Sequence, residues 1–71
     1  MSKLRQDVID KVRKDAAQDR KNAEKAFTDP DKFLRDRLAY LTARWKTYDF
    51  FLPEDIETLR IAFMDGAKVK P

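Results

Sequence analysis

The stretch Phe27-Thr28-Asp29-Pro30-Asp31 separates two long segments, and both carry the 3.6-residue apolar periodicity of a helix. The residue before a proline avoids the helical region, and an Asp there can cap the helix that the proline begins. The Asp-Pro pair therefore predicts a bend at 28–29, with one helix over 2–27 and a second over 30–48. Because the link is short, the two helices are expected to lie antiparallel and side by side.

A third helix is predicted over 53–65. Pro53 suits a first helical position, the acidic residues after it favour the positive end of the helix dipole, and Gly66 supplies a stop. No stretch alternates apolar and polar residues for long enough to indicate a strand. The sequence predicts one small all-α domain over 1–71: an antiparallel helical hairpin, a third helix folded back on it, and a frayed tail at 67–71.

Three apolar stripes, one on each helix, predict the core. The stripes are Leu4, Val8, Val12, Ala16, Ala23 and Phe27 on the first helix; Phe33, Leu34, Leu38, Leu41, Trp45 and Tyr48 on the second; and Leu52, Ile56, Leu59, Phe63 and Ala67 on the third.

Four charged residues fall within the stripes of the hairpin. Asp15 and Asp19 lie in the first stripe, and Arg37 and Arg44 lie in the second. Counting outward from the bend places Asp19 opposite Arg37 and brings Asp15 near Arg44. A charge among apolar side chains is costly unless it is paired. The spacing therefore predicts two ion pairs across the hairpin.

The composition disfavours enzymatic and metal chemistry. The 71 residues include no Cys, no His and one Gly. Acid–base and nucleophilic catalysis most often use His or Cys, and a phosphate-cradling loop needs several glycines. The tight acidic groups lie at predicted helix starts, where helix capping accounts for them. We expect a protein that is not an enzyme, with no catalytic residues, no cofactor and no metal.

The expected setting is the cytoplasm. The first residues lack the apolar run of a signal peptide, no Cys indicates disulfides, and the longest strictly apolar run, at 50–52, is far too short to span a membrane. No membrane partner is expected. A chain of this size is typical of small bacterial or phage regulators.

A domain this small gains only a few kcal/mol from its core, and without Cys or His it has no disulfide or zinc site to add. Association is the remaining route to stability. The preferred hypothesis is a helical protein-interaction module, a regulator, inhibitor or adaptor that docks onto a larger protein. Aromatic and Arg residues are enriched at binding hot spots. The candidate partner-binding residues are Tyr40, Arg44, Tyr48, Phe50, Phe51, Ile61 and Met64.

Two alternatives remain open. The first is a nucleic-acid binder that uses the basic and aromatic residues of the second helix, although the net charge is only +3 and neighbouring acids repel phosphate. The residues of this alternative are Arg35, Arg37, Tyr40, Arg44 and Lys46. The second alternative is a self-assembling homodimer.

The pair Phe50 and Phe51 also has two interpretations. It is either a plug under the end of the hairpin or an exposed tip.

Overall fold

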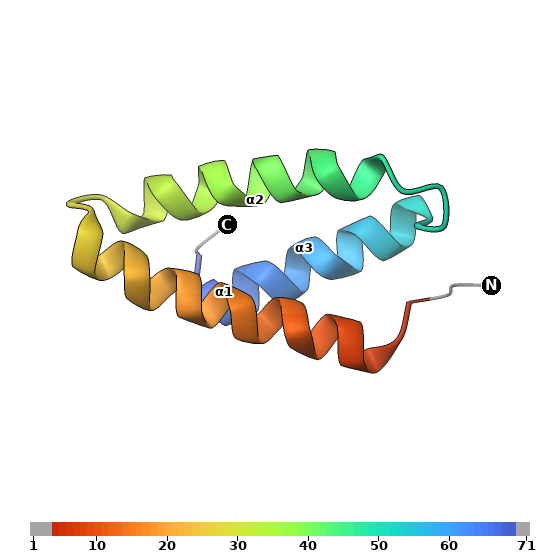
Figure 1. Cartoon of the computed structure of the whole chain (residues 1–71), viewed down its shortest axis with the longest axis horizontal. Coiled ribbons are helices and arrows are strands. Elements are labelled where there is room, and N and C mark those ends of the chain that lie inside the picture. Colours follow the sequence, from red (N-terminus) through yellow and green to blue (C-terminus); the bar gives the residue numbers. More distant parts are fainter. Residues whose placement is uncertain (1–3, 70–71) are drawn as a thin grey trace.

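The computed structural model describes residues 4–69 and holds three helices and no strand in that range: α1 (Gln6–Ala26), α2 (Pro30–Lys46) and α3 (Pro53–Ala67). α1 and α2 form an antiparallel hairpin, while α3 runs in the same direction as α1 and packs against both helices (Figure 1). The predicted all-α domain, with a third helix folded back on a hairpin, is confirmed.

The bend between α1 and α2 has the predicted construction. Asp29 precedes α2, and its Oδ1 accepts a hydrogen bond from the backbone N–H of Lys32 at 3.2 Å. Pro30 occupies the first helical position. α2 ends two residues earlier than predicted because Thr47 closes its last turn: the Thr47 hydroxyl donates to the Arg44 carbonyl at 2.6 Å.

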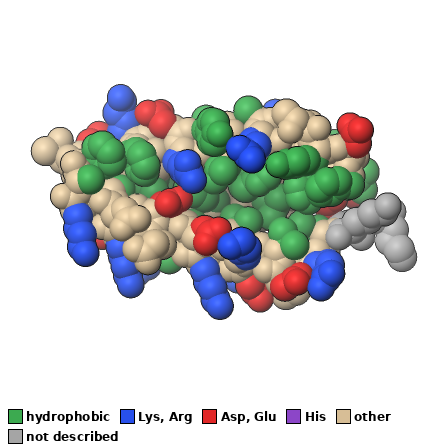
Figure 2. All heavy atoms as spheres, in the orientation of Figure 1, with side chains coloured by type: hydrophobic (Ala, Val, Ile, Leu, Met, Phe, Trp, Pro, Cys, Tyr) green, Lys and Arg blue, Asp and Glu red, His purple; other side chains and the backbone are tan. Residues whose placement is uncertain are grey.

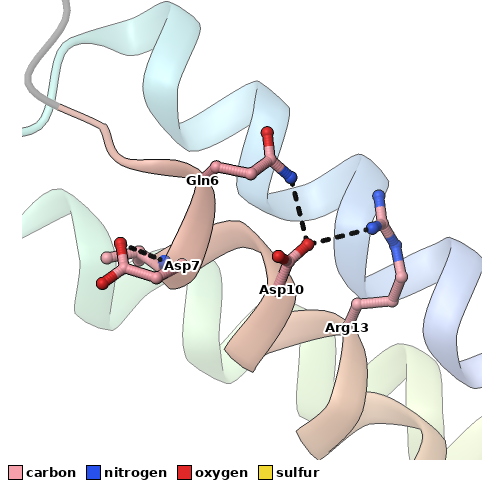
Figure 3. A network of polar contacts seen from close by, with 5 residues as sticks. Gln6, Asp7, Asp10 and Arg13 are labelled. Atoms are coloured by element: carbon pink, nitrogen blue, oxygen red, sulfur yellow. Dashed lines mark hydrogen bonds and ion pairs between the residues drawn. The ribbon is translucent and has the colours of Figure 1, made fainter.

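α1 begins at Gln6 rather than at residue 2, and it ends one residue early. Arg5 has an extended backbone, and its side chain caps no helix N–H. A polar network then covers the first turns, in which Asp10 Oδ1 accepts from Gln6 Nε2 at 3.0 Å and from Arg13 Nη1 at 3.4 Å (Figure 3). Residues 2 and 3 of the predicted helix lie outside the described range.

Gly66 does not end α3, which continues to Ala67. A Cβ atom at position 66 would lie 2.2 Å from the Arg13 carbonyl oxygen and 3.0 Å from the Ala16 Cβ. The glycine therefore permits close approach of α3 to the α1 backbone, a role different from the predicted stop. Its neighbour one turn earlier, Ala62, is also buried.

Lys68 supplies the actual end of α3, with a left-handed φ of 56°. Its N–H and the N–H of Val69 both donate to the Met64 carbonyl, the latter at 3.0 Å. This cap turns the chain so that Val69 packs into the core. The predicted frayed tail is therefore wrong for Ala67 and Val69, which are both buried, while Lys70 and Pro71 lie outside the described residues.

The core lies where the three stripes meet. Its fully buried large side chains are Leu34, Leu59 and Phe63. Alanines fill the tight places between helices, at positions 16, 23, 62 and 67. Four residues expected in the core are exposed: Phe27, Tyr48 and Leu52, which lie just outside the helix ends, and Val8 within α1.

Candidate interaction surface

A ladder of aromatic and arginine side chains runs along one edge of α2 and continues into the connection that follows the helix. We define the ladder as Arg37, Tyr40, Arg44, Tyr48 and Phe50. The Arg37 guanidinium carbon lies 5.9 Å from the Tyr40 ring centroid, and Arg44 Nη1 donates to the Tyr40 hydroxyl at 3.4 Å. The Tyr48 and Phe50 rings stack at 5.4 Å. Figure 2 shows apolar and basic side chains side by side over α2, with acidic ones both among them and toward α1.

The predicted ion pair between α1 and α2 involves Arg37, the first residue of the ladder. Arg37 Nε lies 3.5 Å from Asp19 Oδ2, and the Asp19 side chain is only 25% exposed. This pair confirms the register that was counted outward from the bend. Arg20 and Asp31 form a second ion pair across the hairpin, nearer the bend. This pair was not predicted from the sequence.

The second predicted ion pair is wrong. Asp15 contacts Lys11 of its own helix, with Nζ and Oδ2 3.6 Å apart, and Arg44 contacts tyrosines. The reason is the position of α3: α1 and α2 diverge with distance from the bend, with α3 between them (Figure 1). Asp19 and Arg37, the predicted pair nearer the bend, therefore meet, whereas Asp15 and Arg44 lie too far along the helices to do so.

Arg44 is a positioned but unneutralised cation. Hydrogen bonds to the Tyr40 hydroxyl, and then to the Tyr48 hydroxyl, raise the pKa of its guanidinium above the ordinary value. No carboxylate pairs with it among residues 4–69. The exposed guanidinium thus contacts neutral hydroxyl groups, and its remaining N–H groups can meet a carboxylate or a phosphate.

The connection between α2 and α3 carries a compact cluster of three rings, Tyr48, Phe50 and Phe51, which we call the aromatic tip. Phe50 and Phe51 meet edge-to-face at 4.6 Å, and Tyr48 and Phe51 do so at 5.9 Å. Phe51 packs partly into the core, whereas Phe50 is 55% exposed. Each of the two interpretations from the sequence therefore holds for one residue: Phe51 is the plug under the end of the hairpin, and Phe50 is the exposed residue of the tip.

The remaining partner-binding candidates do not join the ladder. Ile61 is 53% exposed and lies on the outer side of α3, opposite the buried Leu59 and Phe63 by helical period. Met64 packs against the core. These two residues therefore lie apart from Tyr40, Arg44 and the aromatic tip.

The residues proposed for nucleic acid are also divided. Arg37 lines a groove of about 130 Å³ between α1 and α2. Lys46 lines a different groove of about 350 Å³ between α2 and α3, where it meets Arg60. Arg35 lies on the side of Lys46 by helical period, away from Tyr40 and Arg44. The five candidates thus form two groups on opposite sides of α2.

A second aromatic pair, at the bend, was not predicted as a surface. The Phe27 and Phe33 rings stack at 4.7 Å with planes 18° apart, and Phe27 is 48% exposed. Both rings line a shallow pocket of about 280 Å³ together with Asp36. The available signal in the sequence was the place of Phe27 at the predicted end of the first helix, where the overlap with other helices ends.

Residues 4–69 hold neither a metal-binding cluster nor a membrane-spanning helix. No group of three His, Cys, Asp or Glu side chains in that range is placed to hold a metal ion. None of its helices combines the length and apolar character needed to cross a membrane. No known protein family matches the sequence, and no curated protein or solved structure is significantly similar to it.

Proposed function

We propose that this protein is a small non-enzymatic helical module that docks onto a larger protein, as a regulator, inhibitor or adaptor, through the aromatic tip. The observation that carries the proposal is the half-exposed Phe50 ring, which contacts the rings of both Tyr48 and Phe51. Aromatic anchors of this kind dominate the energetics of protein interfaces.

The way in which Phe50 is mounted supports this role. Phe51 packs partly against the core, and Tyr48, just after the end of α2, stacks on Phe50, so the exposed ring contacts two neighbouring rings. A side chain that is already ordered loses less conformational entropy when a partner covers it. Phe50 can therefore fill an apolar pocket of a partner at low entropic cost.

A photo-crosslinking benzoylphenylalanine at position 50 tests the proposal in cells that express the chain. We expect an adduct heavier than a dimer of the chain, and none when the same group replaces the exposed Arg35 on the other side of α2. The captured protein is then purified and titrated by calorimetry. Phe50→Ser should weaken its binding at least tenfold, whereas Ile61→Ser, also at an exposed apolar residue but on the outer side of α3, should not.

Two outcomes would contradict docking through the aromatic tip. One is an adduct no heavier than a dimer of the chain, and the other is equal loss of binding for Phe50→Ser and Ile61→Ser. The nucleic-acid alternative is less well supported, because its basic residues divide between two sides of α2 and Arg37 is paired with Asp19. Filter binding of labelled single-stranded DNA and RNA at low salt tests that alternative directly, since phosphate contacts weaken steeply as salt rises.

A further inference from the structure

The face of α2 centred on Tyr40 carries two opposite charges at equal distances along the helix. Asp36 lies four residues before Tyr40 and Arg44 lies four residues after it, so the two charges fall about 40° to either side of the tyrosine at about 100° per residue. All three residues are exposed. One seven-residue repeat on the same face adds Phe33 and Thr47 on either side of Tyr40.

Neither charge on this face is neutralised within residues 4–69. Arg44 contacts only the two tyrosines, and no basic side chain pairs with Asp36. Other charged residues of α2 do have partners, since Arg37 pairs with Asp19 and Asp31 pairs with Arg20. The hairpin therefore uses the charges that point toward α1 and leaves Asp36 and Arg44 available to a second molecule.

We propose that this face pairs with the same face of a second copy of the chain, with the two α2 helices antiparallel about a two-fold axis at Tyr40. Such an axis places Asp36 of each copy level with Arg44 of the other across the seam, and it places the two Tyr40 rings together. The arrangement forms two identical ion pairs around an aromatic centre. It also brings Phe33 of one copy opposite Thr47 of the other.

The charges specify the direction of pairing as well as the partner. With parallel helices in register, Asp36 would face Asp36 and Arg44 would face Arg44, which is repulsive. The antiparallel arrangement turns both contacts into attraction and also opposes the two helix dipoles. Self-complementarity of this kind favours a second copy over an unrelated protein. A folded chain of 71 residues without disulfides would also be stabilised by the association.

The inference goes beyond the proposed docking function, because the aromatic tip lies past the end of the pairing face. In an antiparallel pair the two tips lie at opposite ends of the assembly. Failure of the dimer would therefore leave docking through Phe50 standing, and failure of docking would leave the dimer standing.

Charge exchange tests the pairing by sedimentation equilibrium between about 1 µM and 1 mM protein, a range that covers weak to moderate affinities. The wild-type chain should shift with concentration from the 8.4 kDa monomer to twice that mass. Asp36→Arg and Arg44→Asp should each weaken the dimer at least tenfold, because each change makes both contacts repulsive. The double variant, in which the two charges are exchanged, should restore the dimer to within about threefold of the wild-type affinity, given usual deviations from additivity.

A mixture of the two single variants gives an independent readout. One variant then carries only basic residues at positions 36 and 44 and the other only acidic ones, so the mixture should form a heterodimer although each variant alone stays monomeric. Arg35→Asp is the matched control, since it reverses a charge on the other side of α2 and should leave the dimer unchanged. Restoration in the double variant also shows that neither substitution acts by unfolding the chain.

Three results would overturn the proposal. The first is a wild-type chain that stays monomeric at every concentration, which would leave the Tyr40 face to a different protein or to nucleic acid. The second is a double variant that remains as weak as the single variants. The third is an Arg35→Asp variant that weakens association as much as Arg44→Asp, because the dimer would then use the other side of α2.

Discussion

The two sides of α1 make contacts of different kinds. Against α3, α1 forms a close apolar contact in which Gly66 lies directly on the backbone at Arg13 and beside Ala16. Against α2, it is connected by ion pairs such as Asp19 with Arg37, and a groove of about 130 Å³ remains between the helices. The close side excludes other molecules, whereas the open side presents the ladder to them.

Under the proposed function, stability and recognition are therefore assigned to different helix pairs. Close apolar packing supplies most of the free energy of folding, while half-exposed ion pairs contribute little. The hairpin can therefore remain splayed, with aromatic rings at its rim, because α3 holds the molecule together.

Phe63→Ala is expected to have the largest effect, because the Phe63 ring lies where α3 meets both other helices and is 1% exposed. Removing a buried aromatic ring costs about 3–5 kcal/mol in the free energy of unfolding. A domain of this length has roughly 4–10 kcal/mol in total. Urea denaturation followed by circular dichroism should show a large loss of stability.

The matched control for Phe63→Ala is Phe50→Ala, the same change at an exposed ring, with an expected cost below about 1 kcal/mol. Equal costs would mean that Phe50 is buried in solution.

Gly66→Ala tests the close side by the sign of its effect. In an unobstructed helix interior this substitution stabilises by about 0.5–1 kcal/mol. Here the added Cβ meets backbone atoms of α1, so we expect a loss of about 1–3 kcal/mol from overpacking. Asp65→Ala, at the exposed neighbouring position, should lie within about 0.5 kcal/mol of the wild type. A stabilising Gly66→Ala would show that α1 and α3 do not approach this closely.

Asp19→Asn tests the open side and should have the smallest effect of the three. It removes a half-exposed ion pair while nearly preserving shape, so the expected cost is about 0.2–1 kcal/mol. Asp15→Asn makes the same chemical change one turn earlier, where the partner Lys11 is well exposed, and should cost less. Thermal melting at low and high salt compares the two variants. A larger cost for Asp15→Asn would indicate that Asp15 pairs with Arg44 in solution after all.

Local chemistry allowed the sequence to predict much of the fold. Asp29 and Pro30 act through the adjacent backbone, so the bend and the start of α2 followed from residue type alone. The pairing of Asp19 with Arg37 lies close to the bend, and a small error in helix direction does not separate the two residues. Farther from the bend the same error grows, and the predicted pairing of Asp15 with Arg44 failed for that reason.

Residues whose role depends on a distant segment could not be assigned in this way. Gly66 has the sequence context of a helix stop, and only the position of α1 shows that it serves packing instead. The spacing of Ala62 and Gly66, two small residues one turn apart, was the available signal. On the candidate surface, Tyr40 and Phe50 were identified from the sequence, but periodicity could not determine which of Phe50 and Phe51 enters the core.

Trp45 is the single tryptophan, and it lies almost buried in the groove between α1 and α2, near Asp15 and Phe63. Its intrinsic fluorescence therefore originates from one site, on the open side of the molecule. Any opening or closing of the hairpin alters the water around this indole and shifts its emission, without an added dye. The emission of Trp45 thus reports directly on the spacing of α1 and α2, the two helices that border the groove.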